Sequence, residues 1–304
     1  MDRTNPSELL VRQRLSALTR TWPGAQNGDV PSIHQARVAT RRLREALPLI
    51  ASGARGRKLA RAVKKITRAL GPVRELDVAL INLDELEAAG DVPRLAIARL
   101  RQVIGQERRL LHTAMRRRLE RTDLDKLRKR AVAAARKHKP DASAAPAGRG
   151  RVRDPERLAA AEERAARRGT TLRATMDNAA GIYLPDRLHE VRIAVKKLRY
   201  AMELSRELSG SRAMAALRTL KQAQDLLGRM HDLEILIART RAVQGSSSAA
   251  SLRLSADLDR VVRRLETECR QLHGHYMASR HALLTICDRV EAAPERRAAA
   301  EPAA

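Results

Sequence analysis

The sequence predicts an all-α protein made of two related halves. Apolar residues recur every three or four positions through most of its 304 residues, which is the period of an amphipathic helix. Alternating runs of β-branched residues, which would indicate strands, are missing. A segment near the N-terminus is repeated in the second half of the chain, and this indicates the duplication of one helical unit.

The periodicity predicts ten helices. They cover residues 5–20, 31–52, 55–70, 73–89, 92–135, 156–180, 186–208, 211–227, 230–242 and 252–290. The last of these carries apolar or small side chains at alternating steps of four and three residues from Leu265 to Val290. We therefore expect these residues to form one continuous buried stripe.

The chain is expected to divide near its middle. Residues 136–155 combine prolines and glycines with small and basic residues, a composition typical of a linker. This predicts a first helical bundle over residues 1–140, a flexible linker over 141–155 and a second bundle over 156–290. Residues 291–304, rich in alanine, are expected to form a disordered tail.

The charge of the chain predicts a polyanionic partner. It has 61 Lys and Arg against 35 Asp and Glu, a formal net charge of +26. Residues 1–150 carry +18 and residues 151–304 carry +8, so the bound anion is expected to lie closer to the first half. With three Tyr, one Trp and no Phe, the chain lacks the stacking platforms on which most single-strand nucleic-acid binders rely.

The cellular compartment is predicted from the cysteines and the apolar segments. Two cysteines, Cys269 and Cys287, form no disulfide framework, which fits a reducing compartment. The longest stretch without Lys, Arg, Asp or Glu has 11 residues, from Ala242 to Leu252, and is too short to span a membrane. We expect a cytoplasmic protein without a membrane partner.

Two blocks of sequence carry the internal repeat. Residues 33–47 match residues 188–202 at an offset of 155, and residues 70–80 match residues 227–237 at an offset of 157. In the first pair of blocks His34 aligns with His189, and Arg37 with Arg192.

The first block places its cations in a row. On a helix, the side chains of His34, Arg37, Arg41 and Arg44 fall within roughly 80° of arc, and His189, Arg192, Lys196 and Arg199 do the same in the second half. Like charges at this spacing repel one another, and a bound anion would relieve the repulsion. The alternatives are a solvated cationic helix face and, for the histidines, imidazoles satisfied in the core or at a helix end.

The helix expected over residues 55–70 repeats this design. Arg57, Arg61, Lys64 and Arg68 recur every three or four residues, beside Lys58 and Lys65. Two basic helices are therefore expected to form the walls of one groove. In the second half Arg218 and Lys221 align with Arg61 and Lys64, whereas Asp225 replaces Arg68, so that wall is expected to be less basic.

The motifs His34-x-x-Arg37-x-x-x-Arg41-Arg42-x-Arg44 and His189-x-x-Arg192-x-x-x-Lys196-Lys197-x-Arg199 resemble the paired motifs of the conserved histidine α-helical domain, or CHAD, family. The resemblance extends over nearly the whole chain. It implies two pseudo-symmetric four-helix bundles around a basic central groove or pore. It also implies binding of inorganic polyphosphate and association with polyphosphate granules. The residues that it places on the binding surface are His34, Arg37, Arg41, Arg42, Arg44, Arg61, Lys64, Lys65, Arg68, His189, Arg192, Lys196, Lys197, Arg199, Arg218 and Lys221.

The second copy departs from the first at one aligned position, where His231 stands in place of Arg74. The role of this position stays open. Carboxylates follow in both copies and are expected either to pair with neighbouring cations or to act as helix-start charges. They are Glu75, Asp77, Asp232 and Glu234. If bound polyphosphate raises the pKa of the repeated histidines, binding should tighten on acidification.

Catalysis and metal binding are not expected. The family is often fused to tunnel-type triphosphatases, but the nearest match here to their Glu-x-Glu-x-Lys start is Glu85-Leu-Glu87, which lacks the lysine and lies on a predicted helix. No Gly-rich phosphate loop is present. Cys269 and Cys287 would stand about 27 Å apart on one helix, too far to share a metal ion. We therefore expect no cofactor and no catalytic residues. The alternative function is nonspecific nucleic-acid binding by a basic helical protein.

Overall fold

A computed structural model describes residues 6–51, 53–137, 146–147, 151–152, 155–179, 181–209, 214–246 and 252–294. These residues are almost entirely helical, which confirms the predicted all-α class. The exception is one antiparallel pairing of two-residue strands, β1 (Pro146–Ala147) and β2 (Arg151–Val152), inside the predicted linker. The other linker residues from 141 to 154, and the tail beyond residue 294, lie outside the described residues.

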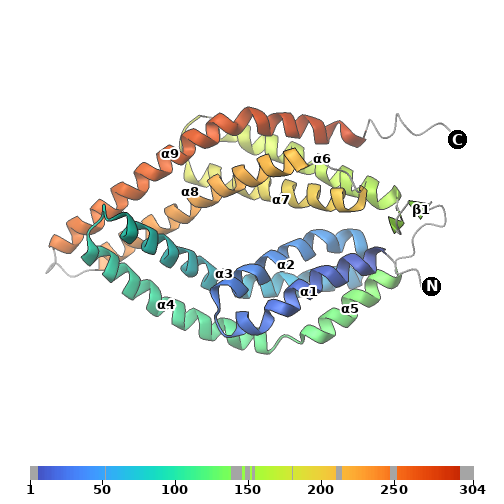
Figure 1. Ribbon diagram of the computed structural model, residues 1–304, viewed down its shortest axis with the longest axis horizontal. Helices are drawn as coiled ribbons and strands as arrows, with labels where there is room; N and C mark the ends of the chain where they lie inside the picture. The colour runs from blue at the N-terminus through green and yellow to red at the C-terminus, as the bar shows by residue number, and fades with distance from the viewer. Residues whose placement is uncertain are drawn as a thin grey trace.

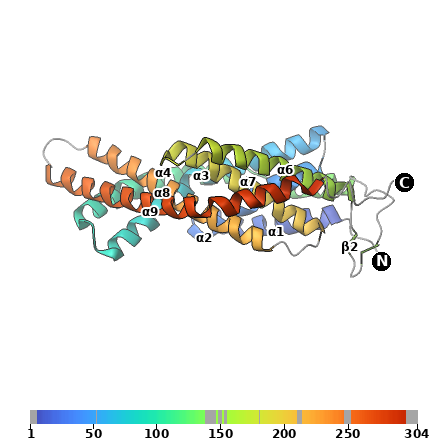
Figure 2. The same ribbon diagram turned by 90° about the horizontal axis from the view of Figure 1, so that it is seen from above.

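The two halves of the chain lie side by side along the long axis of the molecule (Figure 1; Figure 2). The first half contains α1 (Pro6–Gln26), α2 (Val30–Ile50), α3 (Gly53–Ala89), α4 (Arg94–Glu120) and α5 (Leu124–Lys137). The second half contains α6 (Pro155–Asn178), α7 (Pro185–Ser209), α8 (Met214–Ser246) and α9 (Leu252–Glu291). The repeated motif thus lies on α2 in one half and on α7 in the other.

Several predicted helix boundaries are wrong. The first helix, predicted over residues 5–20, continues as α1 to Gln26. Residues 55–70 and 73–89 form the single helix α3, which runs through Pro72, and residues 211–227 and 230–242 form the single helix α8. Proline removes one helical hydrogen bond, but Leu70 and Val73 are fully buried on either side of it, so core packing keeps α3 continuous. Conversely, the segment predicted as one helix over 92–135 is divided into α4 and α5.

Local capping explains where these helices begin and end. Gly90 adopts a φ of +72° directly after α3, a backbone conformation that glycine adopts without steric cost. Asp123 accepts a hydrogen bond from the backbone N–H of Lys126 at 2.7 Å, which caps the N-terminus of α5. The short turn between α4 and α5 therefore lets α5 fold back against α1 and α3.

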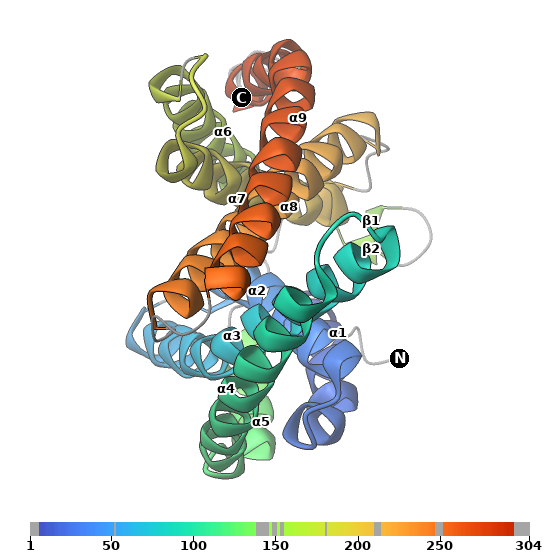
Figure 3. The same ribbon diagram turned by 90° about the vertical axis from the view of Figure 1, so that its left-hand side faces the viewer.

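The core consists of three hydrophobic clusters. One lies among the helices of the first half and also includes Leu204 of α7. A second lies among α6, α7, α8 and α9. The third joins the halves, because Leu83 and Leu100 of the α3–α4 hairpin pack into one cluster with Leu236 and Val261 of the α8–α9 hairpin. Figure 3 views the molecule from this joined end. The two halves thus share a core rather than being connected only through residues 138–154.

No helix in the described part of the chain has both the length and the apolar content that crossing a bilayer requires.

Candidate functional site

Four helices line a polar cavity of about 410 Å³ between the two halves. α2 and α3 contribute from the first half, and α7 and α8 from the second. The ionisable lining residues are the cations Arg37, Arg41, Arg74, Arg192, Lys196 and Arg229, the histidines His34 and His231, and the carboxylates Glu75, Asp225 and Asp232. Cations from both copies of the repeated motif therefore face the same space.

Arg37 and Arg192 hold equivalent positions in this lining. Nη1 of Arg37 donates to the backbone oxygen of Thr67 at 3.3 Å, and Nη2 of Arg192 lies 4.0 Å from a carboxylate oxygen of Asp232. Burial, followed by the neighbouring cations, lowers the pKa of Arg37 to about 10. Both guanidinium groups stay charged at neutral pH. Of the two, only Arg192 forms an ion pair with a carboxylate among the described residues.

A glycine of the second repeated block lies beside each of these arginines, and at Gly71 the contact is close. A Cβ at Gly71 would lie 3.0 Å from Nη1 of Arg37, and one at Gly228 would lie 3.9 Å from Nε of Arg192. The Leu-Gly block therefore has a structural role that the sequence analysis did not identify. The available signal was that the Leu-Gly pair is repeated together with the histidine–arginine motif.

Lys196 is the most strongly perturbed cation of the cavity. Burial lowers its pKa to about 7, and the charges of Arg192, Arg41 and Arg37 act in the same direction. A mutual interaction of this kind requires that the basic groups of α2 and α7 lie close together. An anion placed among them would restore the full charge of Lys196.

The histidines of the repeat are uncharged at neutral pH. Burial lowers the pKa of both His34 and His189, and the nearby cations lower it further. Nδ1 of His189 lies 3.1 Å from Nδ1 of His231, and burial is the largest cause of the fall in the His231 pKa to about 3. Each neutral ring offers one N–H donor. The histidines thus supply donors rather than charge.

The position at which the two copies differ lies in the cavity lining. Arg74 of α3 and His231 of α8 both face the cavity. This aligned position, whose role the sequence left open, therefore belongs to the site. Sequence reasoning also missed Glu75, Asn82 and Arg229 as lining residues. The repeated Leu-Gly block was the signal that could have identified this part of α3.

Five of the sixteen predicted site residues line the cavity: His34, Arg37, Arg41, Arg192 and Lys196. His189 lines an adjoining hollow that also includes His231. Arg42 and Arg199 instead form ion pairs with Glu203, and Lys221 pairs with Asp225.

The remaining predicted residues lie elsewhere. Arg61, Lys65 and Arg68 line hollows beside α4 and α5. Arg44, Lys64 and Arg218 are exposed, Lys197 is half-buried, and none of these four lines the cavity. The part of α3 that walls the cavity thus begins at Gly71, after the predicted basic stripe.

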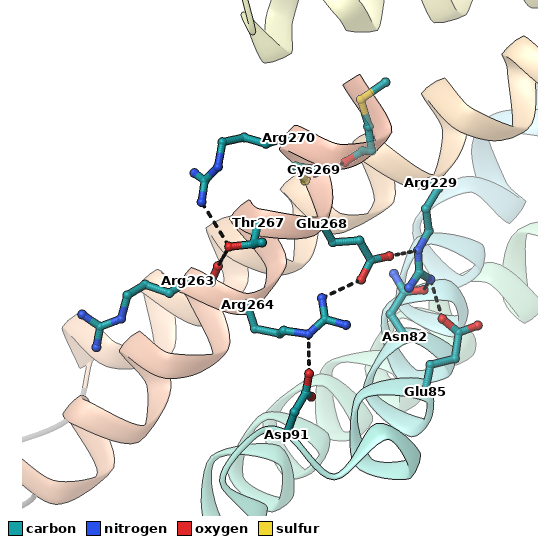
Figure 4. Close-up of polar contacts among 11 residues, drawn as sticks. Asn82, Glu85, Asp91, Arg229, Arg263, Arg264, Thr267, Glu268, Cys269 and Arg270 are labelled. Atoms are coloured by element: carbon teal, nitrogen blue, oxygen red, sulfur yellow. Dashed lines mark hydrogen bonds and ion pairs between the residues drawn. The ribbon is translucent and has the colours of Figure 1, made fainter. Parts of the chain in front are cut away.

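An ion-pair network between the halves adjoins the cavity, because Asn82 and Arg229 belong to both (Figure 4). Arg229 of α8 donates to Asn82 at 2.7 Å and to Glu85 at 2.5 Å, both on α3, and to Glu268 of α9 at 2.8 Å. Arg264 of α9 donates to Asp91, in the turn after α3, at 2.5 Å. Burial would lower the pKa of Arg229, but Glu268 and Glu85 outweigh it and raise that pKa. Arg229 is therefore a neutralised, structural cation.

The described chain is almost entirely helical, and cations from both copies of one motif line its cavity. These two features define the class of the protein. The chain belongs to the CHAD domain family, whose model matches residues 9–241. The resemblance predicted from the two motifs is thereby confirmed.

Two solved structures share the fold. The CHAD domain from the plant Ricinus communis has 20% sequence identity and a TM-score of 0.62, with 90% of each chain covered. PptA from Streptomyces chartreusis has 14% identity and a TM-score of 0.64, with 90% of this chain and 98% of that one covered. No curated protein matches the sequence.

Proposed function

We propose that this protein binds inorganic polyphosphate in the cavity between its halves, without transforming it, and associates with polyphosphate granules. One observation carries the proposal. Arg37 and Arg41 of one motif copy converge with Arg192 and Lys196 of the other on a single cavity. Membership of the CHAD family supports polyphosphate as the anion.

The chemistry of the cavity suits a chain of phosphate groups. Each internal phosphate carries one negative charge, and the chain presents no base for a protein to read. Arginine guanidinium groups hold two phosphoryl oxygens at once. Burial and mutual repulsion destabilise the charged form of Lys196 in the free protein, so binding of an anion relieves an existing strain.

Binding without turnover is supported by how the acidic residues are engaged. Asp225 accepts a hydrogen bond from Lys221 at 2.6 Å, Glu75 accepts one from Arg239 at 3.2 Å, and Asp232 lies beside Arg192. These carboxylates therefore balance and orient cations.

The proposal is tested by calorimetric titration with long-chain polyphosphate at near-physiological salt, with and without excess duplex DNA. Released orthophosphate is measured in the same samples. We expect tight binding that DNA does not displace, and no phosphate release. Ready displacement by DNA would favour the nucleic-acid alternative, and release of phosphate would indicate an enzyme.

Granule association is tested separately. A fluorescent fusion of the protein should co-localise with polyphosphate granules in cells.

A double variant tests the site itself. Arg41→Glu with Lys196→Glu reverses two lining charges, and we expect it to abolish the co-localisation and most of the binding. The matched control is Arg94→Glu with Arg263→Glu, which makes the same change in net charge at exposed positions outside the cavity. Retained helicity in both variants shows that the fold persists. Equal loss of binding in the two would assign binding to overall charge.

A further inference from the structure

A second cationic cleft lies between α3 and α5. The helix α5 lies on the side of the first half that faces away from the second half (Figure 1). Its volume is about 800 Å³. Its floor is formed by Leu59, Leu127 and small side chains. Its basic lining consists of Arg55, Lys58, Arg61, Lys65, Arg121, Lys126 and Arg130. Asp123 is the only carboxylate among the lining residues, and it caps α5.

The cations of this cleft are not neutralised by carboxylates. No ion pair identified within the described residues involves any of the seven. The neighbouring cleft between α1 and α5 is different, because Arg12 and Arg136 there pair with Glu8, and Arg128 pairs with Asp125. Two similar basic clefts flank α5, and the one against α3 retains its positive charge. Such a charge concentration attracts polyanions.

Further cations extend along α3 from the cleft toward the central cavity. Lys65 and Arg121 also line a smaller hollow, of about 390 Å³, together with Arg68 and Arg118. Arg68 lies three residues before Gly71, which lines the central cavity. With a rise of 1.5 Å per residue, Lys58 and Gly71 are about 20 Å apart along α3. The cations of α3 thus continue from the cleft to within one helical turn of the first residue of α3 that lines the cavity.

We propose that the cleft between α3 and α5 is a second binding segment for the same phosphate chain, so that one long polyphosphate molecule occupies the cavity and the cleft together. The proposal rests on the proposed function of the cavity. Joining two segments through one ligand makes the second contact intramolecular and raises the affinity for long chains. The cleft lining contains no aromatic side chain on which a nucleic-acid base would stack, which favours polyphosphate as its ligand.

The test compares short and long ligands on a charge-reversed cleft. The variant Lys58→Glu/Arg61→Glu/Arg130→Glu changes three exposed side chains. The matched control is Arg94→Glu/Arg253→Glu/Arg263→Glu, which changes three exposed arginines outside the cavity and the clefts. Binding of tripolyphosphate, which is too short to span both segments, and of long-chain polyphosphate is measured by calorimetry over a series of salt concentrations.

We expect the cleft variant to lose affinity for long chains by at least about tenfold and to bind one fewer tripolyphosphate than the wild type. The slope of log K against log salt should become less steep by about 2, since three phosphate contacts are lost at roughly 0.7 each. The control should keep the wild-type stoichiometry.

Three results would overturn the proposal or its basis, and they are distinguishable. Wild-type stoichiometry and long-chain affinity in the cleft variant would show that the cleft is not a binding segment. Loss of duplex DNA binding with unchanged polyphosphate binding would make the cleft a nucleic-acid surface. Failure of the wild type to bind either phosphate chain would instead refute the proposed function of the cavity.

Discussion

Nη1 of Arg37 lies 3.0 Å from the point at which Gly71 would carry a Cβ atom. A side chain there would push against the guanidinium group and its hydrogen bond to Thr67. The equivalent pair, Arg192 and Gly228, has an ordinary contact distance of 3.9 Å. The repeated glycine thus sets how closely the motif arginine approaches its neighbouring helix, and the constraint is tighter in the first half.

Replacing Gly71 with alanine is expected to weaken polyphosphate binding a few-fold, because the Arg37 side chain must shift. The matched control is Gly228→Ala, for which the extra methyl group fits and affinity should stay within twofold. Glycine in a helix interior costs about 1 kcal/mol relative to alanine, so the control should also unfold at a higher temperature. Calorimetry and thermal unfolding measure both quantities. Equal affinities in the two variants would show that the Arg37–Gly71 contact does not position the site.

The pH dependence of binding is expected to come from Lys196. Its pKa is about 7 in the free protein, and a bound phosphate raises it, so binding takes up a proton between these two values. Affinity should therefore be level below about pH 7 and fall as the pH rises above it, by up to about tenfold per pH unit. Titrations from pH 6 to 9 measure this profile.

Substitutions separate Lys196 from the histidines. Lys196→Arg should remove the decline above pH 7, because arginine stays charged. His34→Gln and His189→Gln should leave it unchanged, since the pKa values of both histidines are lowered rather than raised in the free protein. A decline that persists in Lys196→Arg and disappears in the histidine variants would restore the role first expected for the histidines.

The salt dependence of polyphosphate binding should report how many cations contact the phosphate chain. Neutralising one contact lowers the slope of log K against log salt by about 0.7. Arg41→Gln, in the cavity, is expected to show this change, and Arg94→Gln, at an exposed position on α4, is expected to show none. Identical slopes for the two variants would mean that Arg41 does not touch the ligand.

The network around Arg229 is expected to stabilise the joined end of the molecule. Arg229→Ala removes hydrogen bonds to three side chains on two other helices, and should lower the free energy of unfolding by about 1–3 kcal/mol. Arg241→Ala is the control, because Arg241 pairs with Glu266 at the surface and exposed pairs contribute about 0–1 kcal/mol. Urea unfolding measures both. Equal effects would show that the network adds nothing beyond a surface ion pair.

Much of the fold was predictable because helix formation leaves local signals. The 3.6-residue period identified every helical region, and the repeat linked α2 to α7 by their shared motif. Boundaries were predicted less well. Pro72 marked a break that core packing overrides, while the turn before α5 depends on Asp123, a capping residue in an otherwise periodic sequence.

Helicity, strong basicity and the duplicated His/Arg motif follow from the sequence alone, because composition and spacing are properties of the chain. Which cations share one cavity depends on how the helices pack. Arg42 and Arg199 are paired with Glu203, and Arg229 is neutralised by Glu85 and Glu268, whereas Arg37 and Lys196 face the cavity. Most of these partners come from distant parts of the chain, and the strength of a charge depends on such neighbours and on burial. Neither the neighbours of a charge nor its burial can be predicted from the spacing of residues along one helix.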